Sequence, residues 1–259
     1  MDVLQPLASF ILGLILGSFL NVCAYRLPRE ESIVYPRSRC PNCKVPIRWY
    51  DNIPVLSFVF LRGKCRFCKA PISWRYPVVE LLTGFMALGL FIRYGFNPVY
   101  FYLLAFGAAL VVTSLIDLEF QIIPDEISLP GILVGLAGSF WNPLVTPLSS
   151  LLGALVGAGS LYLVAEYYYF ITKREGMGGG DLKLLAMIGS FLGVSSLLPV
   201  IFMASLVGAV AGLILAFWQK VHDKRHLALP FGPFLALGAL IILFYPQVVD
   251  LFFGIWFAQ

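Results

Sequence analysis

The chain is built from long apolar runs separated by short polar connections. The runs lie at about residues 6–25, 77–94, 98–117, 127–141, 148–171, 182–195, 198–219 and 229–254. A helix that crosses a bilayer needs about 20 predominantly apolar residues. The runs at 127–141 and 182–195 are shorter than that, whereas the others reach or approach it. The pattern predicts an all-α polytopic membrane protein with about eight transmembrane helices.

The segment from residue 26 to residue 76 departs from this pattern, because it is basic, rich in proline and poor in apolar runs. We therefore expect three regions: a first transmembrane helix at 1–25, a cytoplasmic insert at 26–76 and a transmembrane bundle at 77–259. No basic residue precedes the first apolar run, and no A-x-A cleavage site follows it. We expect this run to stay in the membrane as a span.

Basic residues gather in a few connections. Charged residues make up 12% of the chain, against roughly 25% in soluble domains, which argues against a soluble protein. Eleven of the eighteen lysines and arginines lie between Arg26 and Arg75, and only Arg93 lies outside the basic clusters. With eight spans and both termini outside, the clusters share one side, which the positive-inside rule makes the cytoplasm. We expect the protein to lie in the bacterial inner membrane, with the lipid bilayer as its partner. We do not expect it to bind nucleic acid.

The insert holds four of the five cysteines, in two Cys-x-x-Cys pairs: Cys40 with Cys43, and Cys65 with Cys68. Two such pairs are typical of a four-thiolate zinc site. Disulfides are the alternative, but a cytosolic location disfavours them. Four thiolates leave no open coordination position, so the predicted zinc is structural and supplies folding energy that so small a segment lacks.

Two aspartates lie at the ends of apolar runs, where an ionisable side chain is costly and usually functional. Asp117 ends the run 98–117, at a helix end where the dipole disfavours negative charge. Asp181 follows a glycine-rich stretch and opens the run 182–195. A helix N-cap is an ordinary explanation for Asp181, and equally for Asp125 ahead of the run 127–141.

The predicted topology places Asp117 and Asp181 at the cytoplasmic ends of their helices, so the two carboxyl groups can meet. Two adjacent carboxyl groups do not both ionise easily, and one keeps a proton near neutral pH. Such a pair can hydrolyse a peptide bond by acid–base catalysis. The helix dipoles favour a protonated Asp117 and an ionised Asp181.

Other interpretations of these carboxylates remain. They could relay protons in a proton-coupled membrane transporter, although we find no internal repeat of the kind that transporters often carry. The chain could also be a non-catalytic assembly factor, which would leave Asp117 unexplained. Asn21 and Glu80 are further polar residues at apolar runs: Asn21 can bond between helices, and Glu80 could pair with Arg75.

Segments along nearly the whole chain resemble the type IV prepilin peptidases, which are GxGD aspartic proteases. The resemblance rests on these stretches, in family order: Gly17-Ser18-Phe19-Leu20-Asn21-Val22, Tyr50-Asp51-Asn52-Ile53-Pro54, both cysteine pairs, Ile72-Ser73-Trp74-Arg75-Tyr76-Pro77, Asp117 through Pro124-Asp125, Gly178-Gly179-Gly180-Asp181-Leu182-Lys183, and Pro230-Phe231-Gly232-Pro233-Phe234.

The resemblance implies a membrane-embedded aspartic endopeptidase that cuts the basic leader from type IV prepilins and pseudopilins. It places the catalytic aspartates at Asp117 and Asp181. Many members also methylate the new N-terminus with S-adenosylmethionine, an activity associated with the cysteine-bearing segment, so methylation is implied here too. The insert carries no glycine-rich cofactor motif of its own.

Recognition of a basic leader needs local acids, because the cytoplasmic face of the protein is itself basic. The candidates for substrate binding are Glu119, Asp125, Glu126 and Glu175, together with Gly178 and Gly180, where the missing side chain lets an extended peptide approach.

Overall fold

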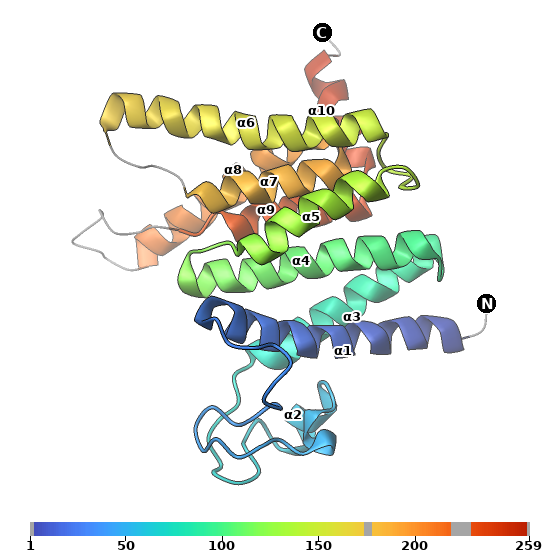
Figure 1. The fold of residues 1–259 in the computed structure, drawn as a ribbon, viewed down its shortest axis with the longest axis vertical. Coiled ribbons are helices and arrows are strands. Elements are labelled where there is room, and N and C mark those ends of the chain that lie inside the picture. The colour runs from blue at the N-terminus through green and yellow to red at the C-terminus, as the bar shows by residue number, and fades with distance from the viewer. Residues whose placement is uncertain (1–2, 174–177, 219–228, 258–259) are drawn as a thin grey trace. The chain divides into compact units, whose positions relative to one another are not determined.

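The structure is a computed structural model, and it describes residues 3–173, 178–218 and 229–257. The described residues are helical apart from loops and two isolated β-bridges (Figure 1). The α-helices are α1 (Leu4–Arg26), α2 (Leu56–Phe60), α3 (Arg75–Tyr94), α4 (Pro98–Phe120), α5 (Asp125–Gly138), α6 (Pro147–Thr172), α7 (Gly179–Leu192), α8 (Leu197–Trp218), α9 (Gly232–Phe244) and α10 (Gln247–Phe257). The short 3₁₀ helices are η1 (Leu27–Arg29), η2 (Trp49–Asn52) and η3 (Val194–Ser196).

Every predicted apolar run carries a helix, which confirms the all-α membrane fold. Within the described residues, five helices are long and apolar enough to cross a membrane, or six if the bent pair α9–α10 is one span. Helices α5 and α7 have 14 residues each, or about 21 Å at 1.5 Å per residue, against roughly 30 Å of hydrocarbon. The chain is a multi-pass membrane protein, and the count of eight spans stays a prediction.

The last apolar run differs from the continuous span expected at 229–254. Its two helices, α9 and α10, meet at an angle of 102°. The break falls at Tyr245 and Pro246. A residue before proline avoids the helical conformation, and proline has no N–H to donate. Pro233, by contrast, sits in the first turn of α9, where its missing N–H costs nothing.

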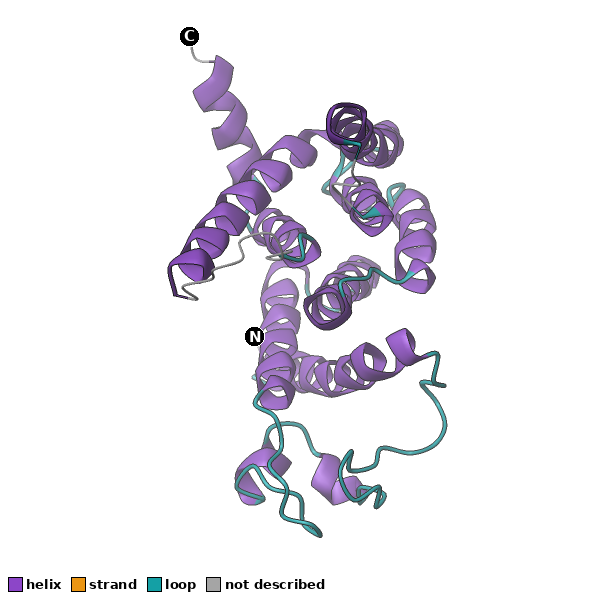
Figure 2. Ribbon diagram, turned by 90° about the vertical axis from the view of Figure 1, so that its left-hand side faces the viewer, coloured by secondary structure: helices purple, strands orange, loops and turns teal. Residues whose placement is uncertain are grey.

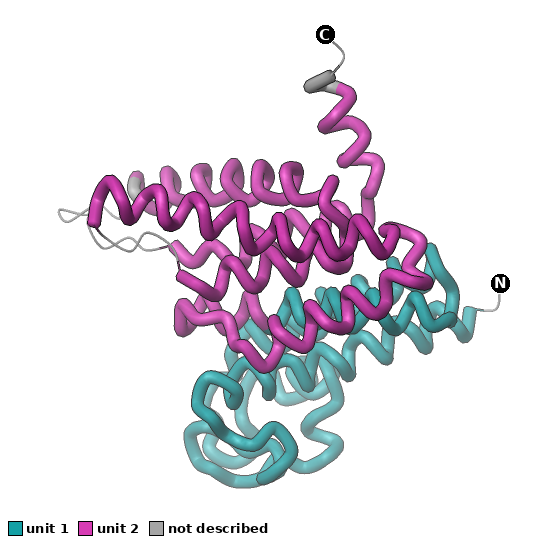
Figure 3. Tube along the Cα trace, turned by 45° about the horizontal axis from the view of Figure 1, so that its top comes forward, with its two compact units in different colours: residues 1–112 teal, residues 113–259 magenta. Residues whose placement is uncertain are grey.

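The chain forms two compact units, residues 1–112 and 113–259, and the division falls within α4 (Figure 3). In the first unit α1 packs along α3. The helices approach closely because Gly13 has no side chain: a Cβ atom there would lie 2.5 Å from the carbonyl oxygen of Thr83. The insert between these helices is mostly loop, with the short helices η2 and α2 (Figure 2).

The second unit is arranged around α7, which contacts α5, α6 and α9. All residues from Leu184 to Leu192 are buried. Helices α6 and α7 touch at two glycines, since a Cβ atom on Gly153 or on Gly189 would lie 2.2 Å from the carbonyl oxygen of the other. Small residues at such contacts let helix backbones pack directly in a membrane. This packing fixes the position of α7, and therefore of Asp181 in its first turn.

Candidate functional site

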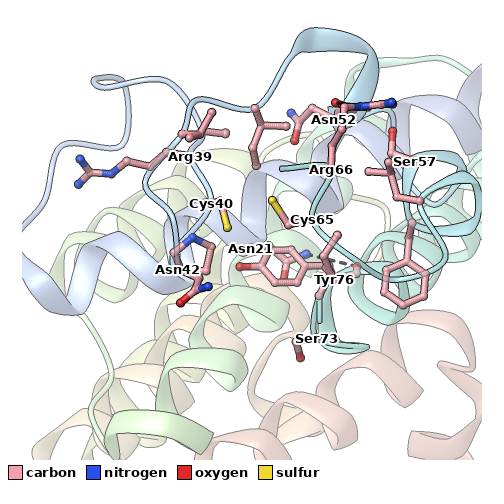
Figure 4. A pocket seen from close by; sticks show the side chains of 18 of the residues that line it. Asn21, Arg39, Cys40, Asn42, Asn52, Ser57, Cys65, Arg66, Ser73 and Tyr76 are labelled. Carbon is pink, nitrogen blue, oxygen red and sulfur yellow. Dashed lines mark hydrogen bonds and ion pairs between the residues drawn. The ribbon is translucent and has the colours of Figure 1, made fainter. Parts of the chain in front are cut away.

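The four cysteines of the insert form one cluster in the first unit. Their sulfur atoms all lie within 4.8 Å of one another, and Cys40 Sγ lies 3.8 Å from Cys68 Sγ. A tetrahedral zinc site with Zn–S bonds of about 2.3 Å places its sulfurs about 3.8 Å apart. The cluster could therefore hold a metal ion, as the sequence predicted. Figure 4 shows Cys40 and Cys65 on facing loops with their sulfur atoms directed toward each other.

Both cysteine loops are built in the same way. The N–H of Cys40 donates to the carbonyl of Val45 at 3.0 Å, and that of Cys65 to the carbonyl of Ala70 at 2.8 Å. The lysine after each second cysteine has a positive φ, 60° at Lys44 and 59° at Lys69. The signal for this duplication is in the sequence, where Cys-x-x-Cys-Lys-x-Pro-Ile occurs twice, but the sequence analysis did not use it.

Hydrogen bonds inside the cluster favour the thiolate form of Cys68 and Cys65. At Cys43 the backbone N–H of Val45 lowers the pKa, but burial and hydrogen bonds with the other three thiols outweigh it and raise the pKa to about 11. Backbone N–H donation from Ala70, followed by the amide of Asn42, lowers the pKa of Cys68 to about 6. Backbone N–H groups of Cys68 and Phe67 lower the pKa of Cys65 in the same way. Donors aimed at sulfur are the outer contacts that metal-bound thiolates need.

Asp117 lies in the last turn of α4, and it is buried, with 5% of its surface exposed. Its Oδ2 atom accepts a hydrogen bond of 2.9 Å from the backbone N–H of Gly232. Gly232 is the first residue of α9, so its N–H has no partner within that helix. The negative end of α4 is thus offset by the positive end of α9. The segment around Gly232 is one of those that carry the family resemblance, but a contact made by a backbone N–H leaves no signal in the sequence.

Asp181 lies in the first turn of α7, three residues after its N-cap Gly178, and no side chain caps the helix. The expected N-cap role of Asp181 is therefore wrong. Ile123 connects this turn to Asp117: a Cβ atom on Gly180 would lie 2.9 Å from Ile123 Cβ, and one on Gly232 would lie 3.2 Å from Ile123 Cδ1 and 2.6 Å from Asp117 Oδ2. The start of α7, the end of α4 and the start of α9 therefore meet around one isoleucine.

The surroundings of Asp181 change the pKa of its carboxyl group. Burial, followed by the negative charge of nearby Asp117, raises the pKa of Asp181 to about 6. A carboxyl group whose pKa is raised toward neutrality beside a second carboxyl is suited to acid–base chemistry. Asp181 lies outside the helices long enough to span the membrane.

Asp125 is the first residue of α5, whose N-cap is Pro124 and which has no capping side chain. The N-cap prediction for Asp125 is therefore also wrong. Its carboxylate instead pairs with Lys183 on α7, at 2.6 and 2.8 Å. Both side chains are partly exposed, so this bond is worth only about 0–1 kcal/mol. It nevertheless links the loop after Asp117 to the helix of Asp181.

The other substrate candidates are spread around this region. Glu119 and Glu126 are exposed, and Gly178 is exposed ahead of α7 with nothing within 4 Å of a Cβ atom built on it. Gly180, by contrast, is in close contact with Ile123, so the space at this position is taken by the chain's own loop. Glu175 lies outside the described residues.

Two protein-family models match the chain. Residues 11–94 match the bacterial peptidase A24 N-terminal domain, and residues 104–213 match the type IV leader peptidase family. A protein of Neisseria gonorrhoeae named prepilin leader peptidase/N-methyltransferase is 38% identical to this chain, over 93% of the chain and 92% of the relative. The chain belongs to the type IV leader peptidase family.

Further relatives of the same name support this assignment. One from Xanthomonas campestris is 38% identical over 90% of this chain and 89% of its own length. Another, from Pseudomonas aeruginosa, is 36% identical over 92% of this chain and 89% of its own length. No solved structure matches this chain significantly. Membership in a peptidase family makes this chain an enzyme, and it favours proteolysis over the transporter and the assembly factor.

Proposed function

We propose that this protein is an aspartic endopeptidase of the bacterial inner membrane that removes the leader of type IV prepilins and pseudopilins. The observation that carries the proposal is the meeting of three helix ends around Ile123, with Asp117 at one end and Asp181 at another. The names of the relatives supply the class of substrate.

Asp117 and Asp181 would act as a pair that shares one proton. The ionised carboxylate takes a proton from the attacking water, and the protonated carboxyl donates to the carbonyl oxygen or the leaving amine. Oδ2 of Asp117 already accepts the N–H of Gly232, so a proton on Asp117 would sit on Oδ1. The raised pKa of Asp181 makes it the better holder of the shared proton, opposite to the roles suggested by the helix dipoles.

The substrate's own chemistry fits this position. A prepilin has a basic leader followed by a hydrophobic helix, so its scissile bond lies at the membrane interface. Both aspartates lie near helix ends, and the positive-inside rule places those ends on the cytoplasmic face. The exposed acids Glu119 and Glu126, together with Asp125 and Glu175, would bind the basic leader. Asp125 is already paired with Lys183, which makes it a weaker candidate for leader binding than Glu126.

The metal of the four-cysteine cluster would be zinc. The sulfur spacing matches tetrahedral Zn–S geometry, and an all-cysteine donor set is typical of structural zinc. Cys40, Cys43, Cys65 and Cys68 would hold the ion and fix the two loops of the insert. With all four positions filled by the protein, the ion would take no part in hydrolysis.

The relatives' names also point to a second activity, N-methylation of the new amino terminus. S-adenosylmethionine would supply the methyl group. The chain's task would then be to hold this donor and to exclude water from it. The preceding peptidase step creates the free amine that accepts the methyl group, so the two activities act in sequence on one substrate.

A cleavage assay tests the peptidase assignment. The purified protein would be mixed with a prepilin in detergent, and Asp117→Asn and Asp181→Asn compared with the wild type. Each variant keeps the size of the side chain and removes the acid, so we expect cleavage to fall by roughly 10²–10⁴-fold. Asp250→Asn, a change at an exposed residue of α10, is the matched control and should cleave normally. Near-normal cleavage by either of the first two variants would disprove the assignment.

A further inference from the structure

The first unit contains a cavity of about 430 Å³ that no step of the peptidase mechanism uses. Its walls are the last turns of α1, the first turns of α3 and the loops of the insert (Figure 4). Small-molecule sites usually measure roughly 300–1,000 Å³, so the cavity is large enough for a nucleoside-sized ligand.

Asn21, on the wall formed by α1, has an unsatisfied acceptor. Its amide nitrogen donates to the carbonyls of Gly17 at 3.1 Å and Tyr76 at 3.4 Å. Its Oδ1 atom is buried and has no hydrogen-bond partner among the described residues, and the residue is 3% exposed. Because an unpaired buried acceptor is costly, this oxygen indicates a ligand that donates a hydrogen bond.

Glu80, on the wall formed by α3, adds a buried carboxylate. It is 6% exposed, and its Oε2 atom accepts the N–H of Val55 at 2.7 Å. Val55 itself has φ 60° and ψ −50°, a strained conformation for a β-branched residue, of the kind that clusters at functional sites. Glu80 also takes a hydrogen bond from Ser18, but a carboxylate has further acceptor capacity, and together with the free Oδ1 of Asn21 it favours a ligand that presents amino groups at this end of the cavity. The basic side chains of Arg26, Arg39 and Lys44 also line the cavity, so it can hold a carboxylate of the same ligand.

The cavity also offers a flat surface. The ring of Tyr76 lies beside Asn21 in Figure 4, and the tyrosine is 38% exposed. An aromatic ring next to a polar acceptor is suited to a nucleobase that carries an amino group. The cavity thus combines space, a ring and two buried acceptors.

We propose that this cavity is the binding site for S-adenosylmethionine, with Asn21 Oδ1 and the Glu80 carboxylate accepting hydrogen bonds from its amino groups and Tyr76 contacting its adenine. This inference rests on the methylation proposed above. The ligand has a flat base and amino groups, which match the ring and the two buried acceptors, and a carboxylate, which matches the basic residues of the lining. The site lies at the last turns of α1 and the first turns of α3.

Binding to the purified full-length protein tests the inference without any turnover. Isothermal titration with S-adenosylhomocysteine, the stable product, should show one site per chain. Asn21→Leu removes the acceptor and Glu80→Gln removes the charge, and each should weaken binding by about tenfold or more. Thr83→Val is the control, a buried polar residue one turn further along α3 that does not line the cavity, and it should bind normally. No binding to the wild type, or unchanged affinity in both variants, would overturn the site.

A second measurement uses the wild type alone, so it does not depend on the variants folding. Ultraviolet cross-linking of radiolabelled S-adenosylmethionine, followed by peptide mapping, should label peptides containing Asn21, Ile53 or Tyr76, which line the cavity. Label confined to other peptides would overturn the site. Asp181→Asn should bind the ligand normally, so the loss of cleavage and the loss of binding are separate outcomes, and either proposal can fail alone.

Discussion

Gly179 and Gly180 are neighbours in the chain but have different surroundings. A Cβ atom on Gly179 would meet nothing within 4 Å, whereas one on Gly180 would press against Ile123 at 2.9 Å. Ile123 in turn lies against Gly232, which donates to Asp117. Small shifts at this contact therefore reach the proposed catalytic pair.

We expect Gly180→Ala to lower kcat/KM for prepilin cleavage by roughly 10–100-fold, because the new methyl group displaces Ile123 and misaligns the carboxyl groups. Gly179→Ala is the matched control and should cleave at the wild-type rate. The measurement is the initial rate of cleavage at equal amounts of folded protein. Equal activity in both variants would show that the contact between Gly180 and Ile123 does not position the site.

The raised pKa of Asp181 predicts a pH dependence. Catalysis by a proton-sharing pair needs one protonated and one ionised carboxyl group, so activity falls at low pH, where both are protonated, and at high pH, where both are ionised. Burial and the charge of Asp117 raise the pKa of Asp181 to about 6, well above the ordinary aspartate value of about 3.9. Since Asp181 holds the shared proton, activity should fall as the pH rises through about 6, which is the high-pH limb of the profile. A plot of kcat/KM against pH with a single limb would count against the pair.

Each half of the four-cysteine cluster is one short loop that carries a Cys-x-x-Cys pair. The sequence predicted that the four cysteines form one cluster, and they do, because Cys-x-x-Cys spacing itself determines how two sulfurs are presented. Cys40 and Cys68 confirm the closure of the cluster at 3.8 Å. The cavity proposed to bind S-adenosylmethionine could not be predicted, because Asn21, Tyr76 and the loops of the insert come from separate segments that only the fold brings together.

Removing one ligand should release the metal. We expect Cys40→Ser to reduce bound zinc from about one ion per chain toward none and to lower the melting temperature of the insert, which gains folding energy from the ion. Cys23→Ala, a change at the fifth cysteine, buried in α1, should keep its zinc. Elemental analysis of the purified proteins decides the matter, and full zinc in the Cys40→Ser protein would exclude the four-cysteine site.

The positions of the helices followed from the sequence better than the details of their ends did. All eight apolar runs became helices, yet the run at 229–254 breaks at Pro246, and neither Asp125 nor Asp181 caps its helix. Capping was the obvious local explanation for both aspartates. In the fold, Asp125 pairs with Lys183, and Asp181 is buried near enough to Asp117 for the charge of Asp117 to raise its pKa, because contacts between helices outweigh local preference.

At the scale of the whole molecule, one physical pattern determines the architecture. Few charges, long apolar runs and basic residues confined to a few connections predicted a helical membrane protein, and the fold agrees. The segments that resemble the type IV prepilin peptidases indicated Asp117 and Asp181 from the sequence alone. What the sequence did not contain was the partner of Asp117: the N–H of Gly232 is 115 residues away, and backbone donors leave no compositional signal.

The central claim is that Asp117 and Asp181, 64 residues apart, act together at one site. The most direct test replaces both with cysteine and treats the membrane-embedded protein with a short bifunctional thiol reagent. Mass spectrometry of the digest should identify one peptide pair joining residues 117 and 181. The control pair, with cysteines at positions 181 and 250, should give no such product. If both introduced thiols react singly with a monofunctional reagent but the 117–181 link never forms, the account of a shared catalytic pair is contradicted.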